Sequence, residues 1–187
     1  MTLESDEILN FWFEENGTDQ WFGKEKSFDE EIRVRFYELM QRAREGKLKS
    51  WSGEPKTCLA LIILIDQFSR NLFRNSPLSW SSDSYALALS KQAIENNYDK
   101  NMNHNEKAFL YLPLMHSEVL EDQDLCVALV EKTLVSGNEF NIKNYESALR
   151  HQYIIARFGR FPHRNEVLGR ISTQEELDFL QEPNSSF

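Results

Sequence analysis

The sequence predicts an all-α fold, built as one domain of seven to eight helices packed as antiparallel helical hairpins. Apolar residues recur at helical spacing in one segment after another. Only seven glycines and five prolines occur, and no segment alternates polar and apolar residues as a half-buried strand does. A chain of 187 residues can bury a full core as a single domain over residues 1–187. We expect order over about 6–181 and a frayed tail at 182–187.

The first half of the chain supplies three predicted helices. Residues 4–15 place acids ahead of apolar side chains, as helix N-termini do. Residues 27–48 show helical spacing behind a capping-box pattern at Ser27 and Glu30. The third helix begins at Pro55, a residue favoured in a first helical turn, and its first half is apolar on all sides. That third helix is therefore expected in the core.

The second half is expected to add five helices. They cover residues 81–97, 105–123, 124–137, 141–159 and 172–181. Pro113 is expected to kink the second of these helices, and Ser172 with Glu175 forms a capping-box pattern in the last. The loops between the helices are short, which favours hairpins of adjacent antiparallel helices.

Composition excludes several classes of function. The net charge of −9 repels a phosphate backbone, so no nucleic acid is expected as a partner. The longest apolar run, residues 59–65, is far shorter than the roughly 20 residues that span a bilayer. With no signal-like N-terminus, we expect a cytoplasmic protein without membrane association. Cys58 and Cys126 lie in apolar helical patterns and are expected to be reduced core residues.

Positive charge is concentrated near the C-terminus. Residues 150–170 contain five arginines and one acid, a net charge of +4 in an acidic chain. Clustered like charges need compensation, either from carboxylates of the protein or from a bound anion. Arginine suits both carboxylate and phosphate, because its planar guanidinium donates two parallel hydrogen bonds.

The helix at 55–74 turns polar in its second half. At about 100° per residue, one arc of the helix carries Asp66, Gln67, Arg70, Asn71 and Arg74. A buried ion without a partner costs several kcal/mol. Asp66 can pair with Arg70 one turn later, whereas Arg74 and the two amides need partners from other segments.

We expect this arc to face the arginine-rich segment and to form a ligand site with it. The predicted binding residues are Gln67, Arg70, Asn71, Arg74, His151, Arg157, Arg160, His163, Arg164 and Asn165. The expected ligand is a small anion or an acidic peptide segment. The alternative is a structural network in which acids such as Asp66 and Glu118 pair with the same arginines.

Acid–base catalysis is a further hypothesis, because coupled buried groups have shifted pKa values. Its candidate residues are Asp66, His116, Glu118 and His163. The histidines and Glu118 lack a metal-ligand spacing, and His116 and Glu118 diverge on a helix, so neither metal nor cofactor is predicted. The aromatic residues at 11–13 and 21–22 could line a peptide groove, but their helical spacing favours a place in the core.

Five motifs resemble one family. They are FWF at 11–13, WFG at 21–23, LIDQFSRNLFR at 64–74, LPLMHSE at 112–118 and HQYIIARFGRFPHRNEVLGRIST at 151–173. Together they resemble the DUF924 family over about residues 6–181. The resemblance implies an all-α fold of tetratricopeptide-repeat-like hairpins, and it implies no activity. Ser69 departs from the proline that the family often has there.

Three functions are compatible with these observations. The first is a helical-hairpin module that binds an anionic ligand or peptide segment. The second is an enzyme for a small anionic substrate, with Asp66, His116 or His163 in acid–base roles. In the third, the arginine cluster is purely structural.

Overall fold

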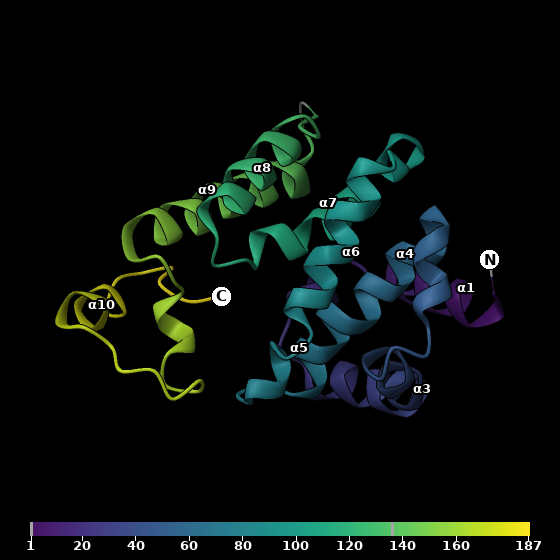
Figure 1. Cartoon of the computed structure of the whole chain (residues 1–187), viewed down its shortest axis with the longest axis horizontal. Coiled ribbons are helices and arrows are strands. Elements are labelled where there is room, and N and C mark those ends of the chain that lie inside the picture. Colours follow the sequence, from purple (N-terminus) through teal and green to yellow (C-terminus); the bar gives the residue numbers. More distant parts are fainter. Residues whose placement is uncertain (1, 136) are drawn as a thin grey trace.

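The computed structural model describes residues 2–135 and 137–187, and these residues form helices and connecting loops without any strand (Figure 1). The predicted all-α class is confirmed. The first half of the chain forms α1 (Leu3–Asn10), η1 (Phe11–Glu15), α2 (Thr18–Trp21), α3 (Lys26–Arg44), η2 (Lys49–Gly53), α4 (Pro55–Ile62), η3 (Ile63–Gln67) and α5 (Phe68–Leu72). The second half forms η4 (Pro77–Ser79), α6 (Asp83–Glu95), η5 (Tyr98–Asn101), α7 (His104–Met115), α8 (Leu120–Glu131), α9 (Glu139–Phe158), η6 (Pro162–Arg164) and α10 (Gln174–Phe179).

Two of these elements, η1 and η3, are π-helical turns that continue α1 and α4 without a break. In a π turn the backbone bonds five residues back, as the Phe68 N–H does to the Ile63 carbonyl. The constant helical period assumed from the sequence does not apply there. Counting α4, η3 and α5 as one helix, the described part of the chain has nine helices. The additional one is α2, within a predicted loop.

Helices α6 to α9 each pack on the next in the chain, as expected of helical hairpins. The boundary between α7 and α8 differs from the prediction, because the expected helix 105–123 is interrupted between Met115 and Leu120. Gln123 explains the interruption. Its Nε2 donates to the carbonyls of Leu114, Met115 and Ser117, which satisfies the carbonyls at the end of α7. His116, Ser117 and Glu118 therefore lie in a loop. Residue 136, in the predicted helix 124–137, is outside the described residues.

Two predicted capping boxes are wrong. Helix α3 begins at Lys26, one residue before Ser27, and Ser27 does not cap it. Helix α10 is capped by Thr173 and Glu176, one residue later than the predicted pair. The Thr173 hydroxyl accepts from the Glu176 N–H at 3.2 Å, and Glu176 accepts from the Thr173 N–H at 2.7 Å.

The main core surrounds α4 and η3. Every side chain from Cys58 to Asp66 is fully buried there, as the apolar pattern predicts. The aromatic residues near the N-terminus also lie in this core, with Phe11 and Trp12 fully buried and Trp21 at 6% exposure. Phe22 differs, because 57% of it is exposed. Cys58 and Cys126 are buried free thiols.

A second, smaller core lies between the last turns of α9 and the residues that follow it, 159–187, which form the C-terminal segment. It consists of Ile154, Ile155, Phe161 and Phe179, with Phe158 packed against them. Figure 1 shows this segment beyond the end of α9, on the side of the molecule opposite α1. The tail, predicted to be frayed, lies against the segment: the Ser185 hydroxyl donates to the Leu180 carbonyl, and the Phe187 ring stacks on His151. No helix in residues 2–135 or 137–187 is both long and apolar enough to cross a membrane.

Candidate functional site

Two of the clustered arginines pair with acids within the C-terminal segment. Arg160 donates from Nε and Nη2 to the two oxygens of Glu176 at 2.6 and 2.7 Å. Arg157 donates to Glu175 at 2.9 Å on the surface. Both contacts attach α10 to the end of α9. Arg157 and Arg160 are therefore paired with acids of the C-terminal segment and do not meet the polar arc of the buried helix.

The residues of the polar arc contact two different helices, α3 and α6. Arg74 donates to both oxygens of Asp29 on α3, at 2.6 and 2.8 Å, and Asn71 donates to the same carboxylate at 2.8 Å. Asp66, Gln67 and Arg70 form a separate group. The expected common surface of five residues is therefore not formed, since Asn71 and Arg74 are committed to Asp29.

Arg70 connects the buried helix to α6. Its two terminal nitrogens each lie 3.1 Å from an oxygen of Asp83, and Nη1 also lies 3.1 Å from Asp66 Oδ1. The i,i+4 pair predicted from the sequence is present. Asp83 was not among the predicted site residues, because an acid at the start of a helix has an ordinary role in stabilising the N-terminus.

Glu118, in the loop between α7 and α8, binds the C-terminal segment. It accepts from both terminal nitrogens of Arg170, at 2.7 and 3.0 Å, and from the backbone N–H of Phe161 at 2.8 Å. Burial opposes its charge, but these hydrogen bonds prevail and hold the pKa of Glu118 below its ordinary value. The loop and the C-terminal segment are thus joined by a bidentate ion pair.

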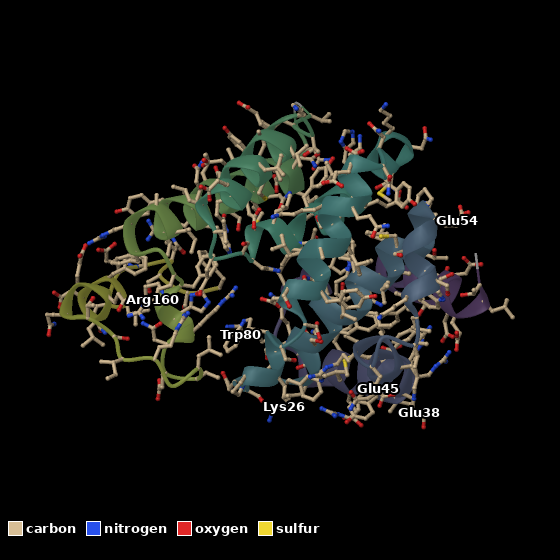
Figure 2. All side chains as sticks on the ribbon, in the orientation of Figure 1. Lys26, Glu38, Glu45, Glu54, Trp80 and Arg160 are labelled. Carbon is tan, nitrogen blue, oxygen red and sulfur yellow. The ribbon has the colours of Figure 1, made fainter. Side chains whose placement is uncertain are left out.

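A cavity of about 250 Å³ lies where these elements meet. Its lining residues come from the turn before α6, from α6 itself, and from the end of α7, the following loop and η6: Trp80, Asp83, Ser84, Leu87, Pro113, His116, Ser117, Glu118 and Arg164. Three predicted residues, His116, Glu118 and Arg164, thereby meet at one site. Figure 2 shows Trp80 on the side of the main body that faces the segment carrying Arg160.

Arg164 is the least compensated arginine at this cavity. Only 7% of it is exposed, yet its guanidinium makes no hydrogen bond to any described residue, and Nε is buried without a partner. Its nearest acid is Asp83, at 3.6 Å. The rings of Phe161 and Trp80 lie 4.5 and 5.6 Å from the guanidinium carbon. Burial, with repulsion from Arg70, lowers the pKa of Arg164 to about 10, so it keeps its charge at neutral pH.

The three histidines of interest have different surroundings. His116 Nδ1 lies 2.9 Å from Asp66 Oδ1. His151 Nδ1 lies 2.8 Å from the Ser147 carbonyl, and burial lowers its pKa to about 3. Burial and the nearby Arg164 lower the pKa of His163 to about 4, and its Nδ1 is buried without a partner. Of the three, His116 lines the cavity.

The remaining predicted residues have local roles. Gln67 donates to Asp66, and the Asn165 amide donates to the Ser172 hydroxyl at 3.0 Å. Among the residues that the structure describes, no group of three or more histidines, cysteines or acids is placed to hold a metal ion.

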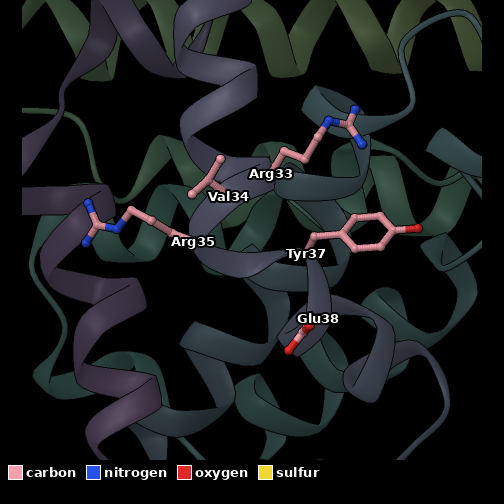
Figure 3. A pocket seen from close by; sticks show the side chains of 5 residues that line it. All are labelled: Arg33, Val34, Arg35, Tyr37 and Glu38. Carbon is pink, nitrogen blue, oxygen red and sulfur yellow. The ribbon is translucent and has the colours of Figure 1, made fainter.

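A larger hollow, of about 350 Å³, lies on the outer face of α3 (Figure 3). Its lining residues are Arg33, Val34, Arg35, Tyr37 and Glu38, all from this one helix. Arg35 already donates to Glu15 at 2.6 Å, and Val34 is 77% exposed. This surface offers no buried polar group without a partner, so the cavity at Arg164 is the better candidate site.

The sequence pattern of a family described as "Bacterial protein of unknown function (DUF924)" matches residues 8–184. The chain belongs to the DUF924 family. The solved structure of a protein of unknown function from Agrobacterium tumefaciens is similar to it, with 32% sequence identity and a TM-score of 0.87, over 95% of this chain and 96% of that chain. No curated protein matches the chain. The resemblance read from five motifs is therefore confirmed, and three of those motifs carry Asp66, His116 and Arg164.

Proposed function

We propose that this DUF924 protein binds a small anionic ligand in the cavity between α6, the α7–α8 loop and η6, with Arg164 as the anchor. The observation that carries the proposal is the state of Arg164, a buried cation without a hydrogen bond to the described residues. A buried guanidinium without acceptors is costly. A carboxylate or phosphate group in the cavity supplies two acceptors in the geometry that arginine favours.

The charges around the cavity support Arg164 as the residue available to a ligand. Arg70 and Arg170 each bind a carboxylate through two nitrogens. Both oxygens of Asp83 already accept from Arg70, so Asp83 compensates Arg164 only through a contact at 3.6 Å. The structural interpretation of the cluster thus accounts for the other arginines and leaves Arg164 unexplained.

The size of the cavity favours a small ligand over a peptide. Pockets for drug-sized molecules usually have volumes of about 300–1,000 Å³, and this one has about 250 Å³. A compact mono- or dicarboxylate or a phosphate fits that volume. We retain the sequence-based expectations of a cytoplasmic protein with tetratricopeptide-repeat-like hairpins as part of the proposal.

Thermal unfolding in the presence of small anions tests this proposal. Phosphate, acetate, succinate and citrate are each added to the wild type and to Arg164→Met at equal ionic strength, with chloride as the reference. We expect at least one anion to raise the Tm of the wild type and not of the variant. A ligand at 100 times its Kd stabilises the folded state by about 2.7 kcal/mol.

Arg157→Met is the matched control, because Arg157 is an exposed arginine paired with Glu175 away from the cavity. It should show the same anion response as the wild type. Phosphate also stabilises proteins by exclusion from their surface, and this general effect is common to all three proteins. Equal responses of Arg164→Met and the wild type to every anion would refute the proposal.

A further inference from the structure

A buried aspartate and a histidine form a hydrogen-bonded pair at the wall of the cavity. Asp66 Oδ1 lies 2.9 Å from His116 Nδ1 and 3.1 Å from Arg70 Nη1, while Oδ2 accepts from Gln67 at 2.5 Å. Burial opposes the charge of Asp66, but Arg70 and His116 prevail and hold the pKa of Asp66 well below its ordinary value. Asp66 is therefore a carboxylate at neutral pH.

The charge of Asp66 determines which nitrogen of His116 carries the hydrogen. A carboxylate only accepts hydrogen bonds, so neutral His116 must donate from Nδ1 and keep its lone pair on Nε2. Burial and the charge of Arg70 lower the pKa of His116 more than Asp66 and Asp83 raise it. The neutral form with a free Nε2 lone pair is thus the main form at neutral pH.

Nε2 is the nitrogen available to a ligand. It has no hydrogen-bond partner among the described residues. It is also absent from their fully buried polar atoms, so solvent can reach it. His116 lines the same cavity as Arg164. The adjacent Ser117 hydroxyl donates to Asp122 at 2.8 Å, so it is not the group that Nε2 contacts. The partner of Nε2 must then come from the ligand or from water.

We infer that His116 is a general base that acts on the ligand held by Arg164, with Asp66 as its positioning residue. The inference rests on the proposed anion binding and adds proton transfer to it. The Nε2 lone pair takes the proton from a ligand hydroxyl or from a water molecule beside the ligand, and the O–H bonding electrons stay on that oxygen. Asp66 stabilises the imidazolium that forms. The substrate class is a small carboxylate or phosphate compound whose reaction begins with this proton loss.

Chemical modification of the full chain tests the inference without knowledge of the substrate. Diethyl pyrocarbonate acylates unprotonated imidazole nitrogens, and mass spectrometry locates the product on each histidine. At pH 7 we expect His116 to react faster than His151 and His163. Asp66→Asn should slow the reaction of His116 severalfold, because the loss of the carboxylate lowers the pKa and the nucleophilicity of the imidazole.

Asp122→Asn is the matched control for the aspartate. Asp122 is also buried, but it accepts from Ser117 and pairs with Lys91 instead of His116, so this variant should leave the His116 rate unchanged. The second arm uses inorganic phosphate as the probe. Phosphate should slow the modification of His116 in the wild type and not in Arg164→Met.

The outcomes separate this inference from the proposed binding. If phosphate raises the Tm through Arg164 but leaves the modification of His116 unchanged, the base is refuted and the binding proposal stands. An equal rate in Asp66→Asn and Asp122→Asn refutes the role of Asp66. If no anion affects the wild type differently from Arg164→Met, the binding proposal itself is refuted, and the inference with it.

A measurement on the wild type covers the case in which Asp66→Asn does not fold. Long-range ¹H–¹⁵N spectra of histidine-labelled protein report the tautomer and the pKa of each imidazole. For His116 we expect hydrogen on Nδ1, a pKa below the ordinary value of about 6.5, and a shift of the Nε2 resonance when phosphate is added. Hydrogen on Nε2 in the neutral form, or a doubly protonated ring at pH 7, overturns the inference.

Discussion

Arg70 and Arg164 lie beside the same carboxylate, yet their energetic roles differ. Arg70 compensates both Asp66 and Asp83, whereas Arg164 only approaches Asp83. Removing one partner of a buried ion pair leaves a charge uncompensated, while replacing an incompletely paired ion by an apolar side chain can be neutral or stabilising. The fold depends on the first arginine, and the proposed ligand on the second.

We therefore predict that Arg70→Met lowers the free energy of unfolding by about 3–5 kcal/mol. Arg164→Met should not lower it by a comparable amount, since Arg70 still holds Asp83 in that variant. Urea unfolding of the two variants beside the wild type measures both values. A comparable loss in both variants would show that Arg164 is a structural residue.

Sequence patterns predicted some of the residues at the site but not the acids that pair with them. The Asp66–Arg70 pair follows from the spacing of one helical turn, and His116 and Arg164 were recognised as polar residues in unusual positions. The partners Asp29 and Asp83 were not predicted. They reach the buried helix from α3 and α6, and no local spacing records such a contact between distant segments.

Helix α10 is attached at its first turn by one buried acid, Glu176. Glu176 is 2% exposed, caps the first turn of α10 and accepts two of the three hydrogen bonds that Arg160 donates. We predict that Glu176→Gln increases amide hydrogen exchange in α10 and leaves exchange in α4 unchanged, because the charge that attaches this short helix is lost. Exchange measured by mass spectrometry tests this.

Glu175→Gln is the control for that experiment. Glu175 is the neighbouring acid, but it is exposed and contacts Arg157 on the surface. An exposed ion pair contributes little, typically about 0–1 kcal/mol, so α10 should exchange nearly as in the wild type. Equal effects of the two variants would mean that Glu176 has no special role.

The helices were predictable where apolar spacing is strong and less so at their ends. Met115 and Val119 stand one helical turn apart in the sequence, so the break between them was missed. The Gln123 side chain from the next helix accounts for the break, because it binds carbonyls at the end of α7. Both Ser172–Glu175 and Thr173–Glu176 fit a capping box in the sequence. Arg160 binds the second acid, which accounts for the register that α10 adopts.

For the whole molecule, buried neutral histidines make stability depend on pH. The pKa is about 3 for His151 and about 4 for His163, and it is lowered for His116 as well. Below pH 6.5 these histidines bind protons more readily in the unfolded chain than in the folded chain, so stability decreases as the pH is lowered. Each histidine contributes up to about 1.4 kcal/mol per pH unit.

We predict that the free energy of unfolding decreases steadily from pH 6.5 to pH 4.5. Urea unfolding across this range measures the slope. His151→Gln should make the slope shallower, because it removes a histidine whose pKa is lowered by burial. A flat profile for the wild type contradicts the assignment of neutral buried imidazoles.

The presence of two separate cores has a consequence for access to the cavity. One wall belongs to the main body, and the other, with Arg164, belongs to the segment built on the small core. The contacts that cross this boundary include the Arg170–Glu118 pair, the hydrogen bond from the Phe161 N–H to Glu118, and the Arg164–Asp83 contact. We therefore expect a molecule to reach the cavity along this boundary without disturbing either core, because the two cores do not join there. A bound anion beside Arg164 would add one more polar contact at this boundary.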